Sequence, residues 1–170
     1  MDILKSYIPD DNAIWLLGEV IHSFDSGQPN FGLPLGNLTS QLFANIYMNE
    51  FDQFVKHELK ARYYIRYADD FVVLSADKRW LQTIAEPIKN FLKSNLFLKL
   101  HPDKIFIKTI ASGIDFLGWV NFPDHRVLRT TTKRRMLKRI GENDAPETIN
   151  SYLGILKHGN ARKLRKMILE

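Results

Sequence analysis

The chain has 170 residues, of which 45% are hydrophobic and 25% charged, as in an ordinary globular protein with one core or one domain and a small appendage. No apolar run approaches the roughly 18–20 residues of a membrane-spanning helix, and no signal-peptide pattern opens the chain. Cysteine is absent, which excludes disulfide bonds and thiolate metal sites. We therefore expect a cytoplasmic protein with no membrane partner.

The basic residues are concentrated at one end of the chain. Residues 1–125 hold 12 Lys and Arg against 15 Asp and Glu, whereas residues 126–170 hold 12 against 4. The whole basic excess, and with it the net charge of +5, therefore comes from the last quarter of the chain. A one-sided basic surface is typical of proteins that bind phosphate backbones, although a pair of solvated basic helices would have the same composition.

The first elements expected along the chain are helical. Asp10–Asp11–Asn12 offers capping groups for a helix that ends near Phe24, and a polar stretch with Gly and Pro then favours a loop that continues through residues 31–37. A long helix is predicted from about Thr39 to Leu59, because apolar residues recur there at three- and four-residue intervals and give one buried face.

Strands and helices alternate irregularly in the remainder. Two β-rich runs, residues 62–67 and 71–74, flank a short acidic turn and predict a hairpin. The further elements expected are a helix at about Lys78–Asn95, strands at 97–100, 104–110, 114–122 and 127–128, and two helices from Thr131 that are broken around Gly141–Pro146. Without regular βαβ alternation this order indicates an α+β fold with an antiparallel sheet backed by helices. We expect one domain at residues 1–128 and a basic helical segment at 129–170.

The acidic turn carries the clearest chemical signal. Asp69 and Asp70 are adjacent between apolar strands, where two carboxylates repel each other unless a cation stabilises them. A tight turn can direct both toward one site, and Mg²⁺ prefers such oxygen ligands. Two metal ions about 3.5–4 Å apart could activate a 3′-hydroxyl and stabilise departing pyrophosphate. The alternative, an exposed hairpin with two solvated acids, is the more common fate of a bare Asp–Asp pair.

Four segments, in order along the chain, resemble motifs of the reverse transcriptase family. Tyr67–Ala68–Asp69–Asp70 matches its Tyr-x-Asp-Asp hairpin, and Leu33–Gln41 matches the preceding loop-and-helix motif. Lys99–Lys104 resembles the later lysine-bearing strand, and Gly113–Trp119 resembles the primer-gripping hairpin. The resemblance implies a polymerase palm at residues 1–128, followed by a thumb-like segment, in an RNA-directed DNA polymerase that copies template RNA into DNA.

Two departures from the group II intron pattern suggest a subfamily. Residues 35–41 read Leu-Gly-Asn-Leu-Thr-Ser-Gln where those enzymes usually carry Gln-Gly-x-x-x-Ser-Pro. This segment and the tail Ser151–Asn160 look like the reverse transcriptases of diversity-generating retroelements, which implies error-prone copying with misincorporation at adenines. A group II intron-type or phage-defence reverse transcriptase, and a non-catalytic RNA-binding module, stay open as alternatives.

The resemblance also assigns roles to individual residues. Asp69 and Asp70 would be catalytic and would hold two Mg²⁺ ions, with Mn²⁺ as a substitute. Residues expected at the nucleotide or primer end are Tyr67, Ala68, Gly36, Ser40, Gln41 and Lys104. The alternatives are a half-buried strand aromatic for Tyr67, a turn glycine for Gly36, helix capping for Ser40 and Gln41, and a solvated strand lysine for Lys104.

A primer grip and a basic surface complete the expected site. The primer grip comprises Phe116, Leu117, Gly118 and Trp119, although apolar residues at such spacing more often serve a core. The residues expected to follow the phosphates of template RNA and of the primer or cDNA are Arg126, Arg129, Lys133, Arg134, Arg135, Lys138, Arg139, Arg162, Lys163, Arg165 and Lys166. The implied partners are this RNA, the primer, dNTPs and an accessory protein on the basic tail.

The two-metal site of the family needs a further Asp on an earlier strand, and the fingers also precede the palm. We expect both to lie upstream of Met1, so that the full-length protein, bacterial or phage-encoded, is the polymerase and the 170 residues alone are inactive.

Overall fold

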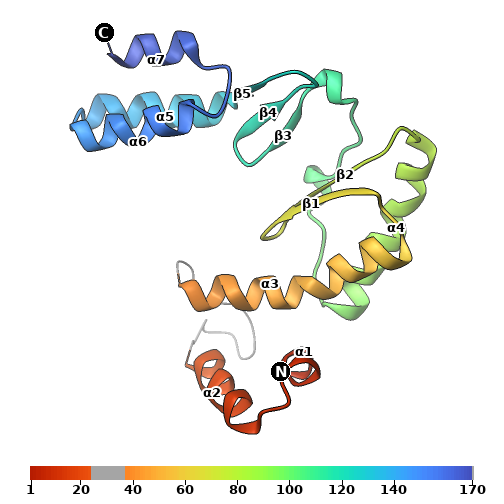
Figure 1. Ribbon diagram of the computed structural model, residues 1–170. Helices are drawn as coiled ribbons and strands as arrows, with labels where there is room; N and C mark the ends of the chain where they lie inside the picture. The colour runs from red at the N-terminus through yellow and green to blue at the C-terminus, as the bar shows by residue number, and fades with distance from the viewer. Residues whose placement is uncertain (24–36, 170) are drawn as a thin grey trace. The chain divides into compact units, whose positions relative to one another are not determined.

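The computed structural model describes residues 1–23 and 37–169. The chain divides into two compact units, Met1–Ile105 and Phe106–Glu170, which we call unit 1 and unit 2 (Figure 1). Both combine helices with antiparallel strands, and the predicted α+β class is confirmed. The expected boundary between a palm at 1–128 and a basic segment at 129–170 stays a prediction.

Unit 1 begins with two helices packed on α3. Helix α1 spans Asp2–Tyr7, α2 spans Asp11–His22 and α3 spans Leu38–Gln53. Leu4, Ile14 and Phe43, one from each helix, form a small buried cluster. Figure 1 shows α1 and α2 on one side of α3 and the hairpin of unit 1 on the other. Helix α3 therefore lies at the centre of this unit.

Helix α3 ends in a wider, π-helical turn. This turn, η1, spans Phe54–Glu58, and the Leu59 N–H donates to the Phe54 carbonyl at 3.0 Å, five residues back. Phe54 and Val55 are consecutive, yet both are buried. The long helix predicted from Thr39 to Leu59 is therefore confirmed as a helical stretch, with a change of winding at its end that propensity does not reveal.

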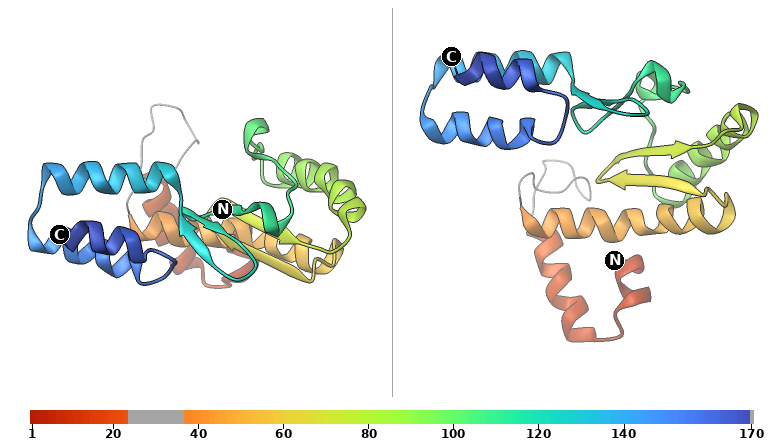
Figure 2. Two further views of the ribbon diagram at one scale, coloured as in Figure 1. Left: turned by 90° about the horizontal axis from the view of Figure 1, so that it is seen from above. Right: turned by 45° about the horizontal axis from the view of Figure 1, so that its top comes forward.

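The predicted hairpin is confirmed. Strand β1 (Tyr63–Tyr67) pairs antiparallel with β2 (Asp70–Leu74), in a register that places Tyr63 opposite Leu74 and Tyr67 opposite Asp70. One face of the hairpin packs on the core of α3 and α4, where the fully buried ring of Phe51 meets Phe71 edge-on at a centroid distance of 4.9 Å. Figure 2 shows the hairpin running beside α3.

Helix α4 (Lys78–Asn95) has the predicted bounds. Asp77 caps its first turn by accepting from the amides of Arg79 and Trp80 at 2.8 and 3.1 Å. The strand predicted at residues 97–100 is wrong. Phe97 instead adopts φ 52°, and the Leu98 N–H donates to the Leu92 carbonyl at 2.9 Å, so that a left-handed residue ends the helix and turns the chain away from its axis.

The strand predicted at residues 104–110 is also wrong. These residues have no regular structure apart from their two ends, which belong to single 3₁₀ turns, η2 (Pro102–Lys104) and η3 (Ile110–Ser112). The strand predicted at 114–122 is a hairpin rather than one strand. Unit 2 holds a three-stranded antiparallel sheet in the order β3–β4–β5. Its strands are β3 (Ile114–Phe116), β4 (Trp119–Asn121) and β5 (Arg126–Leu128).

Three helices follow the sheet, where two were predicted. They are α5 (Thr130–Glu142), α6 (Pro146–Leu156) and α7 (Arg162–Leu169). Met136, Leu156 and Ala161 are buried together with Leu128 of β5, so that the helices and the sheet share one core. Figure 2 shows the three helices as one group. Within residues 1–23 and 37–169, no helix is both long and apolar enough to cross a membrane.

Candidate active site and nucleic-acid interface

The acidic turn of unit 1 is a two-residue hairpin loop. Tyr67 pairs with Asp70, so Ala68 and Asp69 alone make the turn. Ala68 has φ 52°, the left-handed region that a side chain other than Gly or Asn seldom adopts. Ala68, Asp69 and Asp70 are exposed, and the Tyr67 ring is 65% exposed. The turn thus presents both carboxylates and one aromatic ring to solvent.

The chemistry of this pair suits a magnesium ion. Mg²⁺ is usually held by one or two carboxylates, with waters and substrate phosphates completing six oxygen ligands. Asp69 and Asp70 are adjacent, exposed and acidic, and so provide that donor set. In the described part of the chain no three His, Cys, Asp or Glu side chains gather as a metal-binding group. Any further ligands would therefore come from solvent, substrate or other protein residues.

An arginine on β1 ties the turn to α3. The Arg66 Nε and Nη2 atoms donate to Asp52 Oδ1 and Oδ2 at 2.7 and 2.6 Å, which is a bidentate ion pair. Nη1 donates to the Ala68 carbonyl at 2.8 Å and to Asn45 Oδ1 at 3.2 Å. The Arg66 side chain is only 10% exposed. The hydroxyl of Tyr64 adds a 2.6 Å bond to Asp52 Oδ1.

The electrostatics of this cluster favour the ionised pair. Burial alone would raise the pKa of Asp52, but hydrogen bonds from Arg66 and Tyr64 and the Arg66 charge outweigh it and hold the pKa below its ordinary value. Burial and the bond to Asp52 raise the pKa of Tyr64 well above 10.0, so its hydroxyl stays a donor. Sequence reasoning missed Arg66, Asp52 and Asn45. The sequence did hold one signal for Arg66. Side chains alternate between the two faces of a strand, so Arg66 had to lie on the same face as Tyr64, which packs against the core.

The loop-and-helix motif is described from Asn37 onward. Gly36, expected near the nucleotide, lies outside the described residues. The N-cap of α3 is Asn37, so Ser40 does not occupy the capping position. The Ser40 hydroxyl is buried, and the described residues offer it no hydrogen-bond partner. The Gln41 side chain is exposed, and its backbone N–H donates to the backbone carbonyl of Asn37 at 3.3 Å.

Lys104, expected at the triphosphate, is an exposed residue of unit 1 at the end of η2. Its amide donates to the His101 carbonyl at 3.0 Å. The resemblance places such a lysine on a strand, but Lys104 does not lie on a strand in this structure. No strand pairing therefore fixes the position of Lys104 relative to the acidic turn.

The expected primer grip is the β3–β4 hairpin of unit 2. Phe116 pairs with Trp119, and Leu117 and Gly118 form the turn with φ 52° and 81°, as in a type I′ turn. Leu117 is 46% exposed. Phe116 is half-buried, and Trp119 packs against the core of unit 2. The Arg129 amide donates to the Gly118 carbonyl at 2.9 Å, which attaches this turn to the start of α5.

The basic residues expected at phosphates differ in their exposure and in the contacts that the structure gives them. Arg126 lies over the Trp119 ring at 5.1 Å, and its Nε donates to the His158 carbonyl, so this guanidinium joins β5 to the loop between α6 and α7. Arg129 pairs with Asp115 at 3.2 Å, and Lys138 pairs with Glu142 at 3.6 Å. Lys133 is half-buried. The remaining exposed members of the set are Arg134, Arg135, Arg139, Arg162, Lys163, Arg165 and Lys166.

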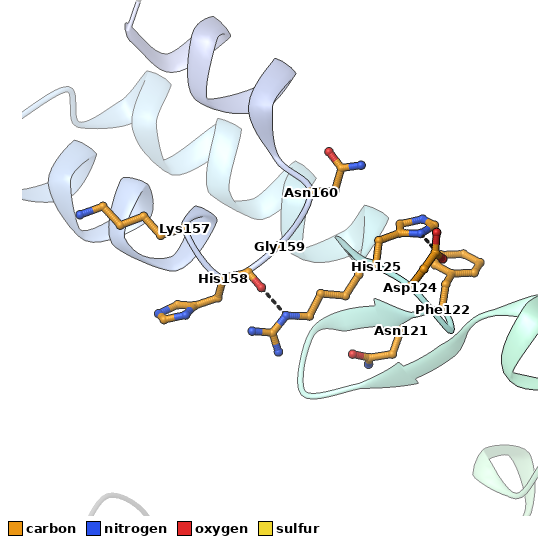
Figure 3. A pocket seen from close by; sticks show the side chains of 9 residues that line it. Asn121, Phe122, Asp124, His125, Lys157, His158, Gly159 and Asn160 are labelled. Carbon is orange, nitrogen blue, oxygen red and sulfur yellow. Dashed lines mark hydrogen bonds and ion pairs between the residues drawn. The ribbon is translucent and has the colours of Figure 1, made fainter.

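A hollow of about 510 Å³ lies beside the loop that Arg126 holds (Figure 3). It is lined by Asn121, Phe122, Asp124, His125, Arg126, Lys157, His158, Gly159 and Asn160. The rings of Phe122 and His125 are stacked at a centroid distance of 4.8 Å. Lys157 is exposed and belongs to the basic tail, but it was not among the residues expected at phosphates.

Two proteins in the comparisons are similar to part of this chain. Protein YkfC of Escherichia coli (strain K12) is 30% identical, over 60% of this chain and 34% of its own length. A protein of Saccharomyces cerevisiae named after COX1/OXI3 intron 2 is 38% identical, over 35% of this chain and 7% of its own length. The chain therefore spans about a third of one relative and a small part of the other.

Residues 15–121 match the family described as reverse transcriptase (RNA-dependent DNA polymerase). The matched region includes the acidic turn, its Arg66 anchor and the β3–β4 hairpin, and it covers more than half of the chain. The chain therefore belongs to the reverse transcriptase family.

Proposed function

We propose that the chain forms the palm region, with a thumb-like segment, of an RNA-directed DNA polymerase that extends a primer on template RNA. The observation that carries the proposal is the exposed two-residue turn bearing Asp69 and Asp70, within the region matched to the reverse transcriptase family. Exposure leaves both carboxylates open to substrate and to cations.

In this proposal Asp69 and Asp70 hold the catalytic Mg²⁺ ions, which supply activation of the primer 3′-hydroxyl and charge neutralisation at pyrophosphate. The methyl side chain of Ala68 leaves room for the primer sugar, and the exposed Tyr67 ring packs beside it. Lys104 approaches the triphosphate, and Leu117 with Gly118 touches the primer backbone. The exposed basic residues of α5 and α7 follow the nucleic-acid phosphates, with an accessory protein on the same tail.

The subfamily proposal is an error-prone enzyme of the diversity-generating type. Its support is sequence pattern: Leu35 before Gly36, Gln41 after Ser40, and the tail Ser151–Asn160. A leucine in place of an amide removes one polar constraint near the incoming base. The intron-type alternative has its own support, because one relative is named after an intron. Sequencing cDNA copied from a defined RNA distinguishes them, since the first proposal expects substitutions concentrated at template adenines.

The test of function is dNTP incorporation on a primed RNA with Mg²⁺. Because the two-metal site of the family needs a further Asp and the fingers, the assay uses a longer form of the protein that contains both. Asp69→Asn and Asp70→Asn should each lower incorporation by the longer form by at least a hundredfold, whereas Glu86→Gln, at an exposed acid on α4, should leave it unchanged. Full activity of Asp69→Asn would refute the proposal.

A further inference from the structure

We infer that Arg66 is the positioning residue of the acidic turn, and that it sets the direction of the Asp69 carboxylate through the main chain rather than by touching substrate. The inference rests on the proposed function of that turn. Its evidence is the set of hydrogen bonds that joins β1, the turn and α3 within unit 1.

The guanidinium of Arg66 has little freedom to move. It uses at least four of its five N–H donors: Nε and Nη2 on Asp52, and Nη1 on both Asn45 and Ala68. Asn45 and Asp52 are seven residues apart, or two helical turns, so they project from the same face of α3. The Tyr64 hydroxyl donates to Asp52 Oδ1 as well, so that oxygen accepts two hydrogen bonds. The side chains of α3 thus fix the orientation of the Arg66 guanidinium plane, and with it the position of the Nη1 atom that donates to the turn.

The bond to Ala68 acts directly on Asp69. The carbonyl of Ala68 and the N–H of Asp69 belong to one planar peptide unit. When Arg66 Nη1 holds that carbonyl at 2.8 Å, it fixes the orientation of the whole unit, and so the backbone from which the Asp69 side chain starts. Ala68 is already in a left-handed conformation that few residues favour, so the turn gains from an external brace.

A lysine could keep the charge but could not keep this geometry. An ammonium is a point charge on a flexible stem, whereas the planar fork of arginine matches a carboxylate in two places and still presents a third nitrogen. If Arg66 serves only the stability of unit 1, Arg66→Lys lowers stability without altering the turn of the molecules that stay folded. If Arg66 positions the turn, Arg66→Lys also makes the turn more mobile in the molecules that stay folded.

The experiment is NMR on the ¹⁵N-labelled 170-residue chain, at a temperature where every variant is folded. Backbone order parameters of Ala68 and Asp69 should be near 0.85 in the wild type and below about 0.6 in Arg66→Lys and Arg66→Gln. The matched control is Arg62→Lys, at an exposed arginine just before the same strand, and it should leave both values unchanged. Unchanged values in both Arg66 variants would overturn the inference.

Mn²⁺ titration of the same samples adds a readout of the carboxylates. Half-broadening of the Asp69 and Asp70 amide signals should require at least threefold more Mn²⁺ in Arg66→Gln than in the wild type. An equal Mn²⁺ requirement would also count against a positioning role. Absence of selective broadening in the wild type would refute the metal site of the proposed function, while the order parameters would still decide the role of Arg66.

Discussion

Gly159 lies against the indole ring of Trp119 so closely that a Cβ atom on Gly159 would come within 2.1 Å of the ring. Both residues belong to unit 2, Trp119 on β4 and Gly159 in the loop between α6 and α7. The loop can reach the sheet only because residue 159 has no side chain. Trp119, which is expected to belong to the primer grip, thus also packs against this loop.

Gly159→Ala should therefore destabilise the chain. The added methyl group forces the ring or the loop to move, and overpacking of this kind costs about 1–3 kcal/mol. Urea denaturation followed by tryptophan fluorescence measures the loss. The matched control is Gly154→Ala in α6, where a Cβ meets nothing within 4 Å and where alanine should stabilise the helix by up to about 1 kcal/mol. Equal stability of the two variants would contradict this packing.

The ion pair of Asp52 with Arg66 should make stability depend on acid pH. Because the folded pKa of Asp52 lies below its unfolded value of about 3.9, the stabilisation is fully present above that value and is lost as pH falls through the folded pKa. Asp52→Asn should lower the free energy of unfolding by about 1.5–3 kcal/mol at pH 7.

The difference between wild type and Asp52→Asn should then shrink as the pH is lowered from 5 to 2. Thermal unfolding followed by circular dichroism across this range measures it. Asp103→Asn serves as the control, because the Asp103 side chain is exposed and lies 4.0 Å from Nδ1 of His101, outside hydrogen-bond distance. A difference that grows toward acid pH would mean that Asp52 is not ionised in the folded state.

Leu117→Asn should raise stability and weaken primer binding. Leu117 has φ 52° at the first position of a type I′ turn, where asparagine is favoured and leucine costs about 1–2 kcal/mol. The free energy of unfolding should rise by about 1 kcal/mol, whereas affinity for a primer–template duplex should fall severalfold if the exposed Leu117 side chain touches the primer. Ile110→Asn, at an exposed apolar residue without positive φ, is the control. Unchanged affinity would remove Leu117 from the primer grip.

The exposed arginines of α5 should control the salt dependence of nucleic-acid binding. Each phosphate contact contributes about 0.9 to the slope of log affinity against log salt on a duplex. Arg134→Gln with Arg135→Gln should therefore reduce the slope by up to about 1.8. Fluorescence anisotropy between 50 and 300 mM NaCl measures it. Lys78→Gln with Arg79→Gln, at the start of α4, is the matched control, and an equal change in both double variants would indicate a nonspecific charge effect.

Local pattern was sufficient for the elements whose stability is local. Helix α4 has a cap at Asp77 and an apolar stripe, and its predicted bounds agree with the structure. The hairpin around Ala68 was predicted because two β-rich runs flank a short acidic turn, and the structure narrows that turn to Ala68 and Asp69. Residues 97–100 and 104–110 have strand-like composition but no partner strand in the described part of the chain, and composition cannot supply one.

The candidate site was only half visible in the sequence. Asp69 and Asp70 are consecutive residues, so they are close together whatever the tertiary structure. Arg66 and Asp52 are 14 residues apart on different elements, and they meet only because α3, its wider last turn and β1 have particular lengths. Such a pair follows from tertiary structure and not from spacing.

The wider turn at Phe54–Glu58 affects how the chain would respond to the loss of one residue. It holds one residue more than an α-helical turn, so deleting exposed His57 would let the coil close in the tighter form. Because the wider turn takes up this extra residue within one turn, its removal would leave the residues downstream facing nearly the same way, and Arg66 could still reach Asp52. A one-residue deletion here should therefore be tolerated more readily than one inside α3, where each residue removed rotates everything that follows by about 100°.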